Sequence, residues 1–269
     1  MVLLNAASDF FARFGVGTLM ALTLVREPEL KRSFYLFVSG LAGFCIVLGL
    51  FFAGRQAFAS GTPGFTLLLC LPFVLGFYAL YAVEWRRSAK ASLLAAVALG
   101  LAGLLGKLSQ DSAGLAWSPA QIFIARINLV AALCLGGIVV STLLLGHWYL
   151  ISPKLSYKPL VRGALLFFAA AWLRLIVLTA VLVVFGWNAG LPGEVFLDRL
   201  FSWNQWGMFF LLRLFWGIVG PLILSFMVYK TAQIQSNQSA TGILYVALVF
   251  VLIGELIADY LWALARIPL

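Results

Sequence analysis

Two carboxylates stand one helical turn apart in the last apolar stretch of the chain. Glu255 and Asp259 lie in the segment LIGELIADYLWAL, and a spacing of four residues places both on one face of a helix. A charged side chain at the centre of a bilayer costs at least ~2.5–3.5 kcal/mol on the insertion scale, and such groups usually face the interior of a bundle. The pair therefore indicates a buried polar site in which the carboxylates pair with arginines or carry a proton.

Arginines in the neighbouring apolar stretches are the expected partners of these acids. At a rise of about 1.5 Å per residue, Arg213 and Glu255 lie at the same depth. Both are about two turns below the outer membrane surface, the side on which we expect both termini. Arg174 falls near the midplane of the membrane. Arg126, which is followed by Asn128, lies about one turn below the outer surface. We therefore expect Arg213 to pair with Glu255, and Arg174, Arg126 and Asn128 to complete a polar cavity.

The first apolar stretch carries a further charged pair, Asp9 and Arg13. Their i,i+4 spacing, with the acid first, favours an ion pair within the helix. The intramembrane arginines then outnumber the acids by one, so the predicted cavity could accept a carboxylate, a lipid phosphate or the polar head of a quinone. The structural alternative is that the charges only lock helices together.

The composition is that of a membrane protein. Of the 269 residues, 64% are hydrophobic and 10% are charged, whereas a soluble domain carries about 25% charged residues. The formal net charge of +9 does not indicate nucleic acid binding, because most of the Lys and Arg residues lie in short loops and form no continuous basic stripe. The expected surroundings of the chain are a lipid bilayer.

A spanning helix needs about 20 mostly apolar residues, and the sequence offers eight such stretches in a single transmembrane domain covering residues 1–269. The basic segments REPELKR, EWRRSAK and SPKLSYKPLVR alternate with poorer ones, so the positive-inside rule places both termini outside. The prediction is an all-α, polytopic helix bundle in a bacterial inner membrane. Its helices are expected at about 5–25, 33–53, 64–83, 90–107, 121–150, 160–186, 205–229 and 240–264.

Two connecting segments and one helix contain residues that predict local structure. Ser118-Pro119 is a good cap and first-turn pair for the fifth helix. Residues 187–204 predict either a short amphipathic helix at the outer interface or a surface loop. Gly217, Gly220 and Pro221 could kink the seventh helix.

His147, the only histidine, ends the fifth predicted helix near the inner surface, opposite the arginines. With Trp148 and Tyr149 beside it, it is typical of an interfacial anchor that is also titratable. A single histidine excludes a bis-histidine haem within the chain. In a His–Met haem, only Met20 or Met227 could serve as the second axial ligand. No haem or metal is therefore expected. The three cysteines all fall in apolar runs and are interpreted as small buried hydrophobes.

The C-terminal stretch LIGELIADYLW resembles the GELxGR-type ending of the membrane anchor subunits of dimethyl sulfoxide reductase-like enzymes, a branch of the polysulfide reductase anchor family. Arg213, in FLLRLFWG one helix earlier, fits the same pattern. The resemblance implies eight helices, both termini outside, no haem, a quinol bound near the outer face and electrons passed to an iron–sulfur partner. This chain has Ala258-Asp259 where the family has Gly-Arg, and it lacks the family's histidine in the N-terminal half.

These features together predict a haem-free membrane subunit of a respiratory redox complex, at most a non-autonomous part of an oxidoreductase. In this interpretation Glu255 or Asp259 handles the proton of a quinone or quinol, arginines hold its head group, and an iron–sulfur or cytochrome subunit supplies the remaining cofactors. Two alternatives remain open: a small transporter for an organic anion or lipid, and a passive anchor or assembly subunit.

Overall fold

The computed structural model describes residues 2–24, 30–54, 59, 61–151, 156–188 and 207–269. Within these ranges the chain forms helices and no strand. The helices are α1 (Val2–Leu24), α2 (Arg32–Ala53), α3 (Pro63–Ala82), α4 (Arg86–Ser112), α5 (Pro119–Ile151), α6 (Lys158–Asn188), α8 (Gly207–Leu214), the π-helical segment η2 (Phe215–Val219), α9 (Gly220–Gln233) and α10 (Asn237–Ala265).

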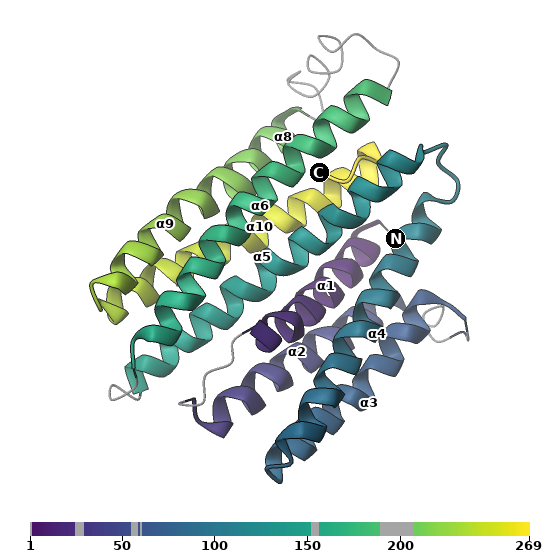
Figure 1. Cartoon of the computed structure of the whole chain (residues 1–269). Coiled ribbons are helices and arrows are strands. Elements are labelled where there is room, and N and C mark those ends of the chain that lie inside the picture. Colours follow the sequence, from purple (N-terminus) through teal and green to yellow (C-terminus); the bar gives the residue numbers. More distant parts are fainter. Residues whose placement is uncertain (1, 25–29, 55–58, 60, 152–155, 189–206) are drawn as a thin grey trace.

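Segments α8, η2 and α9 follow one another without a break, so the described residues form eight long helical rods. The predicted all-α bundle and its eight helices are confirmed. Both termini lie at the same end of the bundle (Figure 1), which we name the terminal end. The fourth helix continues to Ser112, beyond the predicted end at 107, and most of the predicted amphipathic segment 187–204 lies outside the described residues.

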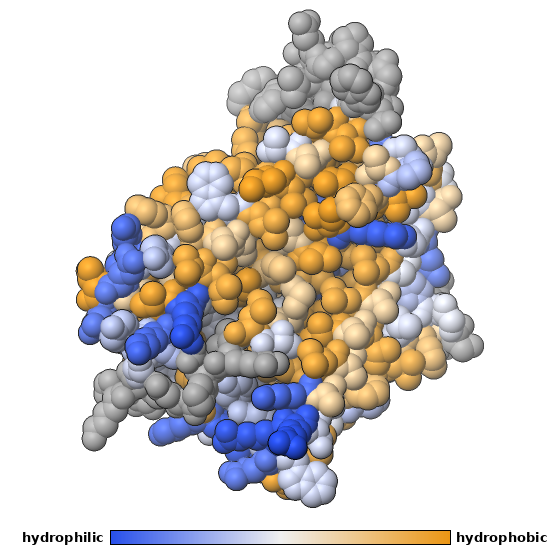
Figure 2. Space-filling view, viewed as in Figure 1, coloured by the Kyte–Doolittle hydropathy of each residue, from blue (hydrophilic) through white to orange (hydrophobic). Residues whose placement is uncertain are grey.

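The bundle has the dimensions and surface of a membrane protein. Seven of the described helices are long and apolar enough to cross a bilayer. The remaining one, α1, carries Asp9 and Arg13 and packs against α2, α4, α5 and α10. Figure 2 shows a surface that is mostly apolar along the helices, with hydrophilic residues gathered most densely away from the terminal end. Three residues of the basic segments that predict the inner side, Arg32, Arg86 and Lys158, begin α2, α4 and α6. These helices start at the end opposite the termini (Figure 1).

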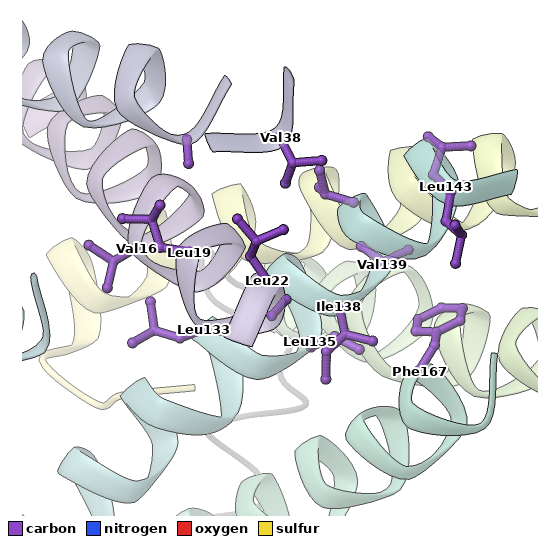
Figure 3. Close-up of a cluster of buried hydrophobic side chains, with 14 of the residues drawn as sticks. Val16, Leu19, Leu22, Val38, Leu133, Leu135, Ile138, Val139, Leu143 and Phe167 are labelled. Carbon is purple, nitrogen blue, oxygen red and sulfur yellow. The ribbon is translucent and has the colours of Figure 1, made fainter. Parts of the chain in front are cut away.

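The first helix forms much of the core together with α5. Figure 3 shows Val16, Leu19 and Leu22 of α1 facing side chains of α2 and α5, and all three are buried. Separate buried apolar side chains of α5, α6, α8 and α10 form a second cluster around Phe210. Helix α1 is therefore enclosed by its neighbours, which explains how it can carry charges that lipid would not tolerate.

Two glycines bring α1 and α5 into backbone contact. A Cβ atom at Gly137 would lie 2.9 Å from the backbone nitrogen of Thr18 and closer still to the carbonyl group of Gly17. A Cβ atom at Gly17 would likewise meet the backbone of Leu133 at 3.2 Å or less. Small residues at such crossings allow the close packing on which membrane bundles depend.

We expect Gly137→Val to lower the melting temperature of the detergent-purified protein clearly, because the new side chain must push α1 away from α5. Forced overpacking of this kind costs about 1–3 kcal/mol, and occasionally more. The matched control is Gly40→Val in α2, where nothing lies within 4 Å of the Cβ position. Equal melting temperatures for the two variants, measured by circular dichroism, would contradict the close α1–α5 crossing.

Candidate functional site

Glu255 accepts hydrogen bonds from two buried arginines. Arg174 of α6 donates from Nε and Nη2 to the two carboxylate oxygens, each at 3.2 Å. Arg213 of α8 donates from Nη2 to Oε1 at 3.1 Å. The arginine side chains are 1% and 0% exposed and that of Glu255 is 12% exposed. The predicted Arg213–Glu255 pair is confirmed, and Arg174 adds the two-pronged contact that suits a guanidinium.

A close glycine contact makes room for the Arg213 guanidinium. A Cβ atom at Gly254 of α10 would lie 2.8 Å from the backbone nitrogen of Gly217 and 3.0 Å from Nη1 of Arg213. Pro221 has no N–H to donate to the carbonyl four residues earlier, and the helix widens into η2, where the Gly220 N–H bonds to the Phe215 carbonyl. The residues that predicted a kink in the seventh helix therefore lie in, or directly after, a π-helical turn next to the arginine.

Asn128 of α5 links this arrangement to the C-terminal tail. Nη1 of Arg174 donates to the side-chain oxygen of Asn128 and, at 3.4 Å, to its carbonyl oxygen. The Asn128 amide donates to the carbonyl oxygen of Pro268 at 3.1 Å. The tail thus closes over the site, and the prediction that Asn128 and Arg174 share a polar cavity is confirmed.

The charges of α1 pair with other helices rather than with each other. Arg13 forms an ion pair with Asp259 of α10, and Asp9 forms one with Lys107 of α4. The predicted ion pair between Asp9 and Arg13 is therefore replaced by two interhelical pairs. The reason is that α10 passes beside α1 and that α4 continues past Lys107, the last residue of the predicted fourth helix.

The prediction that Arg126 lines the cavity is wrong. Its side chain is exposed, and its Nη2 lies 3.4 Å from the hydroxyl of Ser109. The α5 residues that line the cavity are spaced three or four positions apart, at Ala125, Asn128, Leu129 and Ala132. Arg126 falls on a different face of the helix, and Lys107 takes the position expected for it.

These groups surround a pocket near the terminal end, which we name the polar pocket. Its empty space, including the open mouth, is about 570 Å³. Three acids and three cations line it, so its formal charges balance, and the rest of its wall is largely apolar apart from Asn128. The charged lining residues are Asp9, Asp111, Asp259, Arg13, Lys107 and Arg174, and the other lining residues are Leu104, Leu108, Ala125, Asn128, Leu129, Ala132, Ala258, Trp262, Pro268 and Leu269.

Sequence reasoning missed Lys107, Asp111 and the backbone carbonyl group of Pro268. The i,i+4 spacing of Lys107 and Asp111 is a helical signal that could have extended the fourth helix. Ser118 does cap α5 as predicted: its hydroxyl accepts from the Gln121 N–H at 3.3 Å, and the Gln121 side chain accepts from the Ser118 N–H at 2.8 Å.

His147 lies away from the polar pocket, as predicted. It follows Asn128 by 19 residues in α5, which corresponds to roughly 28 Å along the helix. Its exposed ring makes a 3.1 Å hydrogen bond between Nδ1 and the hydroxyl of Tyr245. Among the described residues, no group of three or more His, Cys, Asp or Glu side chains could hold a metal ion.

Comparisons with protein-family models, with curated proteins and with solved structures found no match. The resemblance to the reductase anchor subunits therefore stays a prediction that rests on residues. In the structure, Gly254 and Glu255 of the GEL tripeptide have separate roles: the glycine admits the Arg213 guanidinium and the acid neutralises it.

Proposed function

We propose that this chain is a haem-free, quinone-interacting membrane subunit of a bacterial respiratory redox complex. The polar pocket takes the head group of a quinol or quinone at the outer side of the inner membrane. An iron–sulfur or cytochrome partner exchanges electrons with that ligand. The observation that carries the proposal is a charge-balanced pocket with largely apolar walls, lined by a buried acid that has one oxygen to spare.

That acid is Asp259, whose side chain is only 3% exposed. One of its oxygens contacts Arg13, whereas Oδ2 has no hydrogen-bond partner among the described residues. A buried polar atom without a partner costs about 1–3 kcal/mol. A ligand hydroxyl that donates to Oδ2 would remove this cost, and a quinol offers such a hydroxyl.

The charge balance favours a neutral ligand over an anion. The sequence alone suggested a surplus arginine in the cavity, but Arg126 lies outside the pocket and Arg213 is paired with Glu255. The repulsion between Asp9, Asp111 and Asp259 and an incoming carboxylate or phosphate would offset the attraction of the three cations in the lining. The pocket therefore supports a quinone more strongly than the organic anion of a transporter.

Oxidation of a quinol releases two electrons and two protons. In the proposed reaction both electrons pass to the redox centre of the partner subunit. Asp259 accepts one proton at Oδ2, while the second leaves to water at the mouth of the pocket. Quinone reduction is the same sequence in reverse. The contacts favour Asp259 over Glu255 for this step, because both oxygens of Glu255 already accept hydrogen bonds from arginines.

The first test is purification of the tagged chain from its native membrane in mild detergent, followed by mass spectrometry of the proteins that accompany it. We expect an iron–sulfur or cytochrome subunit in stoichiometric amount. Recovery of the chain alone, as a stable monomer or homodimer, would contradict the redox-complex proposal.

A second test compares two cations near the terminal end. Lys107→Met should weaken the binding of decylubiquinone to the purified protein by about tenfold, a usual cost of losing a charged pocket contact. Arg126→Met is the matched control and should bind like the wild type, because Arg126 lies outside the pocket. Quenching of tryptophan fluorescence reports binding through Trp262, which lines the pocket. Equal effects of the two substitutions would contradict the assignment.

A further inference from the structure

A second hollow is also lined by Arg13 and Asp259 and lies between α1, α5 and α10. We name it the α1–α10 groove. Three charged residues line it, Arg13, Glu255 and Asp259. The remaining lining is apolar and comprises Phe10 and Phe14 of α1, Ala132 and Gly136 of α5, and Val251 and Leu252 of α10.

The groove adjoins the polar pocket, since both are lined by Arg13, Ala132 and Asp259. Glu255 lines the groove but not the polar pocket, so its 12% exposed side chain is reached from the groove side. Charged groups that open toward apolar surroundings at membrane depth are costly. An occupant with both a polar and an apolar part would suit the groove.

Resting on the proposed function, we propose that the α1–α10 groove holds the isoprenoid tail of the quinone whose head lies in the polar pocket. The ligand class is then a lipid-soluble, tail-bearing quinone that approaches between α1 and α10. The apolar side chains contact the tail, and the ion pair stands where head and tail join. The lining residues that the two hollows share and the apolar side chains that form the rest of the groove carry this assignment.

Gly136 offers a way to fill the groove without touching the polar pocket. It lines the groove from α5, and a Cβ atom there would lie 3.7 Å from the Phe14 ring, which is ordinary contact. Gly136→Ala should therefore be tolerated, whereas the larger side chain of Gly136→Leu must enter the space of the tail. Leu252→Trp narrows the groove from α10, where Leu252 is only partly buried.

The experiment measures the binding of two probes to the purified protein in nanodiscs: decylubiquinone, and the same quinone ring without a tail. Gly136→Leu and Leu252→Trp should each weaken decylubiquinone binding by about tenfold or more, since a few buried methylene groups contribute that much. Both should leave the affinity for the tailless ring within about twofold. Gly136→Ala and Gly40→Leu, the latter at an open site of α2, are the matched controls.

The outcomes separate the two proposals. If the wild type binds both probes and neither groove variant discriminates between them, the tail assignment is overturned while the proposed function stands. If the wild type binds neither probe, both are overturned. Using two variants from different helices, each checked for a monodisperse elution profile, prevents a folding defect in one of them from deciding the result.

Discussion

Glu255→Gln is expected to destabilise the bundle severely. Arg174 and Arg213 would remain 1% and 0% exposed beside a neutral side chain, and their guanidinium groups would no longer be compensated. Removing one partner of a buried ion pair costs on the order of 3–5 kcal/mol. We expect a large drop in the melting temperature in detergent, together with a lower yield of monodisperse protein.

The double variant Glu255→Gln, Arg213→Met tests whether the uncompensated guanidinium groups cause the loss of stability. It leaves one buried guanidinium instead of two, and Arg174 keeps its bonds to Asn128, so it should recover part of the lost stability. A double variant that is as unstable as the sum of its single changes would contradict the shared pairing. Simply exchanging Arg213 and Glu255 is a poor test, because the new arginine at 255 would face Arg174.

Asp259→Asn is expected to abolish most of the quinol-dependent electron transfer while leaving the complex assembled. Asparagine has the shape of aspartate but cannot act as the proton acceptor, and loss of a general base typically lowers a rate by about 10²–10⁴-fold. Its former partner Arg13 is 25% exposed and can be hydrated from the pocket. The measurement is the rate of quinol oxidation by the purified complex with an artificial electron acceptor.

Asp9→Asn is the control for this experiment. Asp9 also lines the polar pocket, and its replacement also removes an ion pair, here with Lys107. Unlike Asp259, however, Asp9 has no buried carboxylate oxygen that lacks a hydrogen-bond partner among the described residues. We expect it to retain most of the rate. An unchanged rate in an assembled Asp259→Asn complex would remove the proton role from this residue.

The sequence by itself determined the eight helices and the positions along them of the charges that it singled out. Long apolar stretches have one stable form in a bilayer, since every backbone polar group must be paired within the segment. The constant rise per residue then places Arg213 level with Glu255, and the two are paired in the structure. The same logic separated His147 from the arginines, because they lie toward opposite ends of the bundle.

The tertiary structure alone decided which side of each helix faces the site. Depth along an axis follows from counting residues, but rotation about the axis is set by side-chain packing, for example by the Gly17–Gly137 contact of α1 with α5. Arg126 lies within about two turns of the start of α5 and Lys107 within about two turns of the end of α4. Of these two, Lys107 lines the polar pocket and Arg126 does not. The Arg13–Asp259 pair depends on which helix lies beside α1. The order of the helices in space cannot be predicted from the apolar pattern of any single stretch.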